Sequence, residues 1–348
     1  MALYLGVLIF SFIVTSVLLV PFINILYRLK LTRRSEIQGS KKVKRISLFD
    51  KMHDYKAGTP VGGGILIVFL VSILYLLILK PISYLGVFIH AAYDVEQEMN
   101  IVFITFVGFA LLGLYDDLIK IFGKMYKGRI GFKTGLKNET QFVLQWAVAL
   151  VVGYLMYKQL NITIVHVPLL DTVLNIGYWF IPFAAFVIVS FANAVNITDG
   201  LDGLVGGILL ICLFAFWIIS AHVLDTPLSI FISLWIGALV AFLYFNVWPA
   251  RIFLGDAGAI SFGATLAVIG LLTGKVFVLL VIGGLFVVEV VSSMVQIFGW
   301  RFLGKPIFPI APLHLWFQLR GWEEPKIVMR AWLAGLILAI FGLWLALV

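Results

Sequence analysis

Charged residues and cysteine are scarce in this chain of 348 residues. Only 12% of the residues are charged, against about 25% in a typical soluble domain, whereas 62% are hydrophobic and the mean hydropathy is +1.10. The one cysteine, Cys212, lies in an apolar run, which excludes a disulfide framework and a cysteine-rich metal site. So little polar surface excludes a soluble protein, a disordered chain and a nucleic-acid-binding module with a basic surface. The composition therefore predicts a membrane protein, with a single domain over residues 1–348.

Long apolar runs predict about ten transmembrane helices. A span needs about 20 predominantly apolar residues. Runs that meet or approach this length occupy residues 4–27, 62–79, 99–115, 142–157, 175–195, 204–221, 229–246, 258–274, 276–299 and 331–347. The run 81–93 is short and interrupted, so we expect a loop or an interfacial helix there. Continuous runs of this kind differ from the alternating strands of a membrane β-barrel, and the sequence predicts an all-α integral membrane protein.

Lysine and arginine are distributed unevenly between the two sides that ten spans would create. Of the 25 basic residues, 22 fall in the loops of one side, residues 28–61, 116–141, 196–203, 247–257 and 300–330. The other side has only Lys80, Lys158 and Lys275. Because cytoplasmic loops carry the excess of basic residues, we predict that both termini lie outside the cytoplasm. Basic residues follow the first apolar run and none precedes it, so we expect no cleavable signal peptide.

Acidic and amide side chains gather where predicted helices end on the cytoplasmic side. Asp116 and Asp117 follow the third span, and Lys120 shares a helix face with Asp116 because the two are four residues apart. After the fifth span a polar residue recurs every three positions, at Asn193, Asn196, Asp199 and Asp202. The loop 196–203 has no lysine or arginine to neutralise these acids. Uncompensated oxygen ligands of this type suit Mg²⁺.

Two more carboxylates stand out by their position. Asp256 lies between Gly255 and Gly258 at the start of the eighth span, where it could cap the helix or leave the helix N–H groups free for phosphate oxygens. Glu289 lies inside the ninth span, where a carboxylate is a functional hypothesis by default, although a structural pair or a hydrogen bond to Ser292 or Ser293 would explain it equally well. Carboxylates, amides and basic groups at one membrane face are the equipment of phosphoryl transfer.

A family resemblance extends along most of the chain. In matching order, five segments resemble the phospho-N-acetylmuramoyl-pentapeptide transferases, which belong to the polyprenyl-phosphate N-acetylhexosamine-1-phosphate transferases. These segments are HDYKAGTPVGGG (53–64), LYDDLIK (114–120), NAVNITDGLDGL (193–204), FLGDAGAISFG (253–263) and APLHLWFQLRGWEEPKIVMRAW (311–332). The resemblance implies ten helices in the bacterial inner membrane and an active site at the cytoplasmic face. It implies Mg²⁺-dependent transfer of phospho-MurNAc-pentapeptide from UDP-MurNAc-pentapeptide to undecaprenyl phosphate, giving lipid I and UMP for peptidoglycan synthesis.

The resemblance also implies roles for single residues. Asp256 looks like the principal Mg²⁺ ligand, with Asn196 beside it. Asp116 looks like the base that deprotonates the lipid phosphate or, in a two-step reaction, the nucleophile. Asp117 would organise phosphates or metal, and Lys120 would neutralise phosphate charge. The other implied positions are His314 as a catalytic residue and, as substrate-binding residues, Lys56, Asn193, Asp199, Gly200, Asp202, Phe253 and Glu289.

Three motifs depart from the family pattern, and the departure at His314 keeps alternatives open. Where the family has three consecutive histidines, this chain reads His314-Leu315-Trp316. A sister transferase that uses UDP-GlcNAc or another UDP-HexNAc is therefore the main alternative. A secondary transporter would need ionisable groups near the midplane and broken helices in both halves, and an inactive scaffold homologue is a further alternative. The expected partners are the two substrates and the lipid bilayer, without nucleic acid, and a homodimer is left open.

Overall fold

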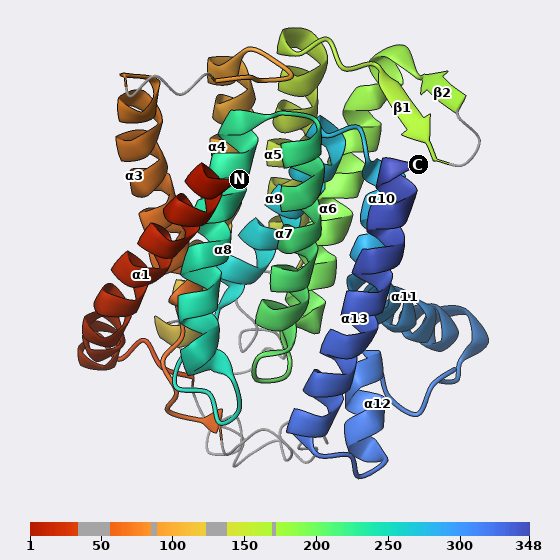
Figure 1. Ribbon diagram of the computed structural model, residues 1–348. Helices are drawn as coiled ribbons and strands as arrows, with labels where there is room; N and C mark the ends of the chain where they lie inside the picture. The colour runs from red at the N-terminus through yellow and green to blue at the C-terminus, as the bar shows by residue number, and fades with distance from the viewer. Residues whose placement is uncertain (34–55, 85–88, 123–137, 169–171) are drawn as a thin grey trace.

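The computed structural model describes residues 1–33, 56–84, 89–122, 138–168 and 172–348, and the fold is a bundle of apolar helices (Figure 1). Within these ranges eight helices are long and apolar enough to cross a membrane. They are α1 (Ala2–Arg28), α4 (Val95–Phe122), α5 (Asn138–Gln159), α6 (Phe180–Thr198), α7 (Leu204–His222), α8 (Thr226–Asn246), α11 (Gly284–Phe298) together with the turn that follows it to Leu303, and α13 (Glu324–Leu347). Two shorter apolar segments are Gly63–Leu79 within α3 (Gly63–Tyr84) and α9 (Asp256–Leu272). The predicted all-α membrane fold is confirmed.

Helix α9 is the centre of the bundle. Every residue from Ala257 to Leu272 is buried, as expected of a helix that is apolar on all sides. Helices α3, α4 and α6 pack around it. Two glycines allow the closest approach: a Cβ atom on Gly113 of α4 would lie 2.3 Å from the Asp256 carbonyl oxygen, and one on Gly263 would lie 2.2 Å from that of Phe191. The first turn of α9 is therefore held against α4.

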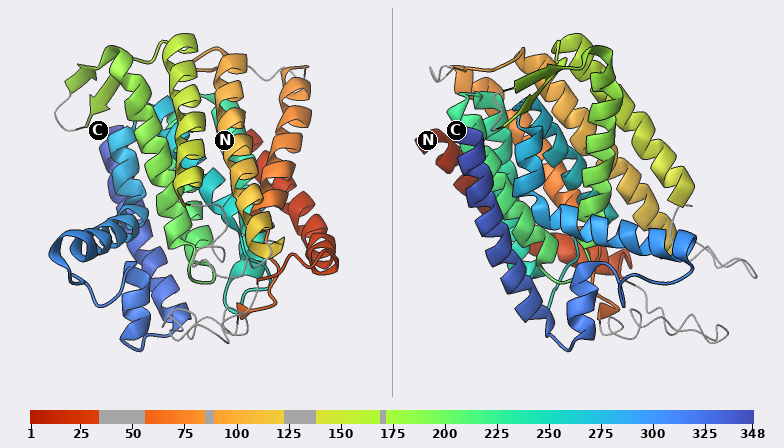
Figure 2. Two further views of the ribbon diagram at one scale, coloured as in Figure 1. Left: turned by 180° about the vertical axis from the view of Figure 1, so that it is seen from behind. Right: turned by 90° about the vertical axis from the view of Figure 1, so that its right-hand side faces the viewer.

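The predicted ninth span, residues 276–299, is not one helix. It divides at Gly283 into α10 (Val276–Ile282) and α11, which is followed by a π-helical turn, η4 (Gly299–Leu303). Figure 2 shows α11 turning sideways, away from the axis of the bundle. The break falls at the Gly283-Gly284 pair, and paired glycines are a common cause of such breaks. A Cβ atom at Gly283 would lie 2.8 Å from the Phe191 ring, so this position also needs glycine for packing.

Other boundaries also differ from the prediction. Helix α4 continues to Phe122, so Asp116, Asp117 and Lys120 belong to one helix. In the region 81–93, α3 extends to Tyr84, residues 89–93 are not helical, and residues 85–88 lie outside the described ranges. The expected loop 300–330 contains a short helix, α12 (Leu313–Leu319). An antiparallel hairpin, β1 (Ile164–Val167) and β2 (Thr172–Asn175), precedes the short helix η3 (Gly177–Trp179). Four-residue strands are too short for alternation to reveal them.

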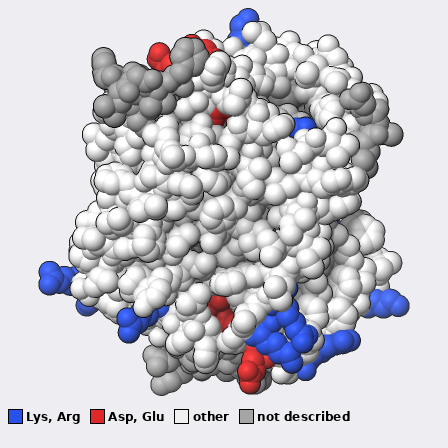
Figure 3. Space-filling view, in the orientation of Figure 1, with Lys and Arg blue, Asp and Glu red and all other residues white. Residues whose placement is uncertain are grey.

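The two ends of the bundle differ in charge. Both termini lie in the upper part of Figure 1, whereas α4 and α6 end, and α7, α9 and α13 begin, at the lower end. Most of the lysine and arginine visible in Figure 3 lies at that lower end. The residues predicted to carry the chemistry are at the same end as this basic surface.

Candidate functional site

Two carboxylates from different helices meet at one ammonium group. Lys120 Nζ lies 2.9 Å from Asp116 Oδ2, one turn earlier in α4, and it also contacts Asp256 Oδ2 at the start of α9. The Asp116 side chain is 1% exposed, whereas that of Lys120 is 36% exposed. The four-residue spacing placed Asp116 and Lys120 together as predicted, and the close approach of α4 and α9 adds Asp256.

Asp117 binds the backbone of the first turn of α9. Its Oδ1 accepts the backbone N–H of Asp256 at 3.2 Å and its Oδ2 accepts that of Ala257 at 3.1 Å. The next two N–H groups of α9 donate to the Gly255 carbonyl oxygen at 3.1 and 2.9 Å. All four N–H groups of the first turn therefore have partners, so this helix end does not offer free donors to a phosphate. Asp256 is also not the cap, because Gly255 occupies that position.

A second cluster surrounds the buried Lys56 ammonium. Lys56 Nζ lies 2.7 Å from Asp202 Oδ1, 2.6 Å from Glu324 Oε1 and 3.4 Å from the Gly200 carbonyl oxygen. Lys56, Gly200 and Asp202 are predicted site residues, whereas Glu324, which is 6% exposed and begins α13, is not. An acid in the first turn of a helix is common for electrostatic reasons, so the helix start alone does not separate Glu324 from its neighbour Glu323. The resemblance of segment 311–332 to the family was the signal that could have found it.

The turn between α6 and α7 is fixed from several directions. Asp202 Oδ2 accepts the Ala250 N–H at 2.9 Å. The Gly203 N–H donates to Asn246 Oδ1 at 3.2 Å, and the Trp332 indole N–H donates to the Gly203 carbonyl at 3.2 Å. Gly203 has φ +78°, a conformation that favours glycine. We call residues 199–203 the site turn.

Glu289 binds His314 and is buried by the protein. Its carboxylate accepts the His314 backbone N–H at 3.2 Å and lies 3.1 Å from His314 Nδ1. Because an ionised carboxylate only accepts, Nδ1 is the donor and Nε2 is left facing the site turn. A Cβ atom on Gly200 would lie 2.5 Å from Nε2, so glycine is needed there. Ser292 donates to the Glu289 carbonyl at 2.8 Å, so the expected bond to the carboxylate is not the one formed.

Asp199 connects the two charged clusters. It is half-buried, and burial raises its pKa to about 7. Lys56 and Arg33 oppose that rise in pKa, whereas Asp117 and Asp202 add to it. Its carboxyl group therefore senses the Lys56 cluster on one side and the α4–α9 cluster on the other. The two clusters belong to one polar region at the end of the bundle.

The remaining predicted residues lie around this region. Asn193 donates its amide N–H to Gln145 Oε1 at 2.7 Å and to the Val189 carbonyl at 2.8 Å, so its amide faces α5. Asn196 is half-buried on α6, and Phe253 is half-buried with the Arg33 guanidinium 5.8 Å above its ring. Within the described ranges no group of three or more His, Cys, Asp or Glu side chains forms a ready metal site. The Asp116–Asp256 pair is the part of the region best placed to hold a cation.

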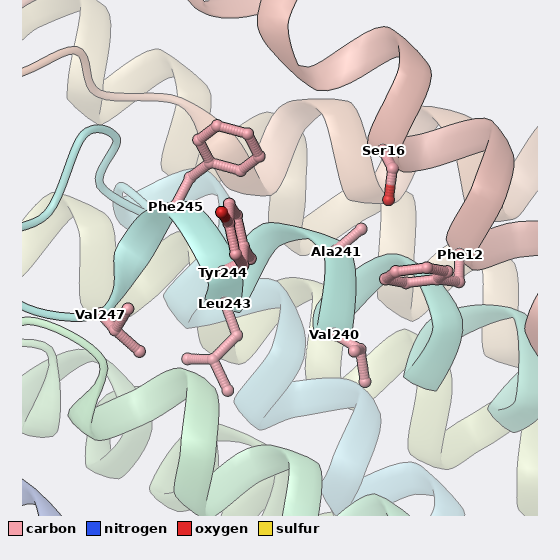
Figure 4. A pocket seen from close by; sticks show the side chains of 8 residues that line it. All are labelled: Phe12, Ser16, Val240, Ala241, Leu243, Tyr244, Phe245 and Val247. Carbon is pink, nitrogen blue, oxygen red and sulfur yellow. The ribbon is translucent and has the colours of Figure 1, made fainter.

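A groove of about 630 Å³ lies elsewhere, between α1 and α8 (Figure 4). Its lining is almost entirely apolar, as expected for a surface that faces lipid, and it includes none of the predicted site residues. The lining residues are Phe12, Ser16, Val240, Ala241, Leu243, Tyr244, Phe245 and Val247.

Comparison with known proteins gives one consistent result. Residues 99–274 match the family described as glycosyl transferase family 4. Over 338 residues the chain is 32% identical to the phospho-N-acetylmuramoyl-pentapeptide-transferase of Geobacillus sp. (strain WCH70), covering 97% of this chain and 96% of that protein. The enzymes of the same name from Bacillus subtilis (strain 168) and Bacillus licheniformis are 32% and 34% identical, over 96% and 95% of this chain and 94% of each relative. The chain therefore belongs to the phospho-N-acetylmuramoyl-pentapeptide transferase family.

Proposed function

We propose that the protein transfers phospho-MurNAc-pentapeptide from UDP-MurNAc-pentapeptide to undecaprenyl phosphate, producing lipid I and UMP. The observation that carries this proposal is the meeting of Asp116 and Asp256 at Lys120, where two helices bring two carboxylates to one cation. Further support comes from relatives of that name, similar over 94–96% of their length. Because this chain departs from the three-histidine motif, the experiment must also distinguish the sister transferases, which use other UDP-sugars.

In a direct transfer, an oxygen of undecaprenyl phosphate bonds to the β-phosphorus of the UDP-sugar. The bond from this phosphorus to the bridging oxygen breaks, and UMP leaves with that oxygen. Asp116 would take the proton of the acceptor phosphate. Lys120, half-exposed on a flexible stem, would turn from the carboxylates to the phosphate oxygens. Such reactions depend mainly on positioning and on neutralising charge.

The residues present fit a bound Mg²⁺ ion. Mg²⁺ usually takes one or two protein carboxylates together with substrate phosphates, and Asp116 and Asp256 already converge on a single cation. Asp256 would be the principal protein ligand of the ion, with Asn196 beside it on α6, and Asp116 would keep its role as the base. When bound, Mg²⁺ would neutralise charge on the phosphates. Asp117 would position Asp256 by fixing the first turn of α9.

We propose that the nucleotide binds beside the site turn. Lys56, Asp199, Gly200 and Asp202 border this position, and the Phe253 ring would stack on uracil where it now faces Arg33. His314 Nε2 approaches the same turn beside Gly200. In this arrangement Glu289 acts through His314 by orienting the imidazole ring.

We further propose ten spanning elements in the bacterial inner membrane, with both termini outside the cytoplasm. The ten are α1, α3 to α9, the broken pair α10–α11, and α13. The support is the distribution of 22 of 25 basic residues among the loops of one side, together with the basic lower end in Figure 3. The site then opens to the cytoplasm, so a water-soluble UDP-linked substrate can reach it from that side. The polyprenyl phosphate reaches it from the bilayer.

The test is UMP release by the purified protein in undecaprenyl phosphate micelles. Wild type should turn over UDP-MurNAc-pentapeptide, stop with excess EDTA and recover with Mg²⁺. Asp116→Asn and Asp256→Asn should each lower kcat at least about a hundredfold, as expected when a charged group at reacting phosphates is lost. Glu96→Gln, an exposed acid at the other end of α4, is the matched control. If the protein turned over UDP-GlcNAc but not UDP-MurNAc-pentapeptide, UDP-GlcNAc would become the proposed substrate. Full activity of Asp116→Asn or Asp256→Asn would refute the proposed site.

A further inference from the structure

We propose that Glu324 is a positioning residue that holds Lys56 and the site turn in place for the nucleotide. This inference rests on the proposed function and deepens it, because it concerns how that site is assembled. Glu324 lies in the segment 311–332 that resembles the family, but the resemblance implied no role for it. The case comes from its contacts, its burial and the origin of the groups that it joins.

Glu324 joins two distant segments through one oxygen atom. Its Oε1 lies 2.6 Å from Lys56 Nζ, 268 residues away in sequence, and the same atom accepts the Asp202 backbone N–H, 122 residues away. Glu324 is 6% exposed, Lys56 is 3% exposed and Asp202 is 4% exposed. The carboxylate is therefore committed to protein donors and shielded from solvent. It is placed to act on the nucleotide through its neighbours.

The charges in this cluster explain why position matters. Lys56 lies between two carboxylates, Asp202 Oδ1 at 2.7 Å and Glu324 Oε1 at 2.6 Å. Buried partners of this kind hold each other in one geometry because a displaced charge would be left without compensation. If Glu324 became neutral, Lys56 would be drawn to Asp202 alone. The Lys56 ammonium would then move away from the Gly200 carbonyl oxygen, which now lies 3.4 Å from it, and would no longer support the site turn.

Helix α13 makes a second contact with the same turn. Trp332, two turns after Glu324, donates its indole N–H to the Gly203 carbonyl at 3.2 Å. The ring packs so closely that a Cβ atom on Gly207 would lie 2.0 Å from Nε1. One helix thus holds both Asp202 and Gly203. Residues 99–274 contain the turn, Asn246 and Ala250 but neither Lys56 nor α13, so part of what positions the turn comes from outside that segment.

Two substitutions separate the charge of Glu324 from its role as a hydrogen-bond acceptor. Glu324→Gln keeps an oxygen for the Asp202 N–H but loses the charge that binds Lys56. Glu324→Ala loses both. Glu323→Gln and Glu323→Ala are the matched controls, because Glu323 is the adjacent residue, is exposed and makes no side-chain cap of α13.

The first experiment measures kinetics and UMP binding. Glu324→Gln should raise the KM for UDP-MurNAc-pentapeptide and the Kd for UMP by at least about tenfold, with kcat within about threefold of wild type, because uniform binding is lost rather than an interaction confined to the transition state. The Glu323 variants should match wild type. In Lys56→Met, adding Glu324→Gln should cause little further loss, because contacting residues are not additive.

The second experiment is independent of turnover. In hydrogen–deuterium exchange, Glu324→Ala should speed exchange of residues 199–204 at least about tenfold, whereas Glu323→Ala should not. If the wild-type protein released no UMP, the proposed function would be refuted. Hydrogen–deuterium exchange would still show whether Glu324 positions the site turn. Unchanged exchange in Glu324→Ala would overturn the inference. So would a Glu324→Gln protein whose KM and Kd equal wild type, even if its unfolding temperature fell.

Discussion

The two neighbouring aspartates of α4 have different partners because successive residues of a helix point about 100° apart. Asp116 shares a face with Lys120 and meets its ammonium group. Asp117 faces the first turn of α9 and accepts the N–H groups of Asp256 and Ala257. Asp117 therefore sets where the Asp256 carboxylate lies. We infer that its main contribution is to the placement of Asp256.

This interpretation predicts that Asp117 substitutions affect stability as well as activity. Asp117→Ala leaves two buried N–H groups without an acceptor and should destabilise the protein by roughly 2 kcal/mol. Asp117→Asn keeps one acceptor oxygen and should cost about half as much. Thermal unfolding in detergent measures both. Glu96→Ala, an exposed position on the same helix, should unfold like wild type. If Asp117→Ala unfolded like wild type and still abolished UMP release, Asp117 would be a catalytic residue instead.

Residue spacing predicted local relations well and distant partners poorly. The pair Asp116 and Lys120 followed from helical geometry alone. The bonds from Asp117 to α9 and from Glu324 to Lys56 join segments 139 to 268 residues apart, and no local pattern specifies them. Glu289 shows the same limit. Its position in an apolar run marked it as unusual, but its partner, His314, depends on how α11 and α12 pack.

At the scale of helices, the site depends on how closely α4 and α9 approach. A Cβ atom at Gly113 would lie 2.3 Å from the Asp256 carbonyl oxygen and 2.5 Å from the Ala257 nitrogen, which are backbone atoms that cannot easily move. The absence of a side chain at Gly113 therefore brings Lys120 of α4 within reach of Asp256. A glycine in the middle of a helix costs stability relative to alanine, so this close contact has to compensate for it.

The helix contact can be tested with two glycines of α4. Gly113→Ala should push the first turn of α9 away and lower kcat about a hundredfold, because a shift of about 1 Å in a catalytic group has an effect of that size. Gly108→Ala is the matched control, since its Cβ atom would meet only Val148 Cγ1 at an ordinary 3.6 Å. It should keep full activity and unfold at the same or a higher temperature. Equal UMP release by both variants would contradict the role given to this contact.

The sequence predicted most helices but not the breaks and short elements. Apolar runs indicated where helices occur, because a helix that is buried in lipid or protein needs apolar side chains. At the break, Gly283 packs so closely that a Cβ atom there would lie 2.8 Å from the Phe191 ring, and the hairpin of β1 and β2 depends on pairing between two four-residue segments. Such features are set by contacts between segments, which apolar periodicity does not encode.

Across the whole molecule, the candidate site is assembled from many segments that meet at one end of the bundle. Its charged groups come from residue 56, from the ends of α4 and α6, from the start of α9, and from α11 to α13. The alternation of loops between two sides predicted that these residues share an end. It did not predict their pairing. The same alternation predicts the direction of the protein in the membrane.

The orientation can be measured by cysteine labelling, because the native Cys212 is buried, at 1% exposure, and should react little. Glu96→Cys lies exposed near the start of α4 and Lys305→Cys lies exposed after η4. In intact spheroplasts a membrane-impermeant maleimide should label Glu96→Cys at once and Lys305→Cys only after the membrane is permeabilised. The physical reason is that basic loops are retained in the cytoplasm. Wild type is the unlabelled control. The opposite labelling pattern would place the site outside the cytoplasm, away from UDP-linked substrates, and would contradict both the proposed topology and the proposed function.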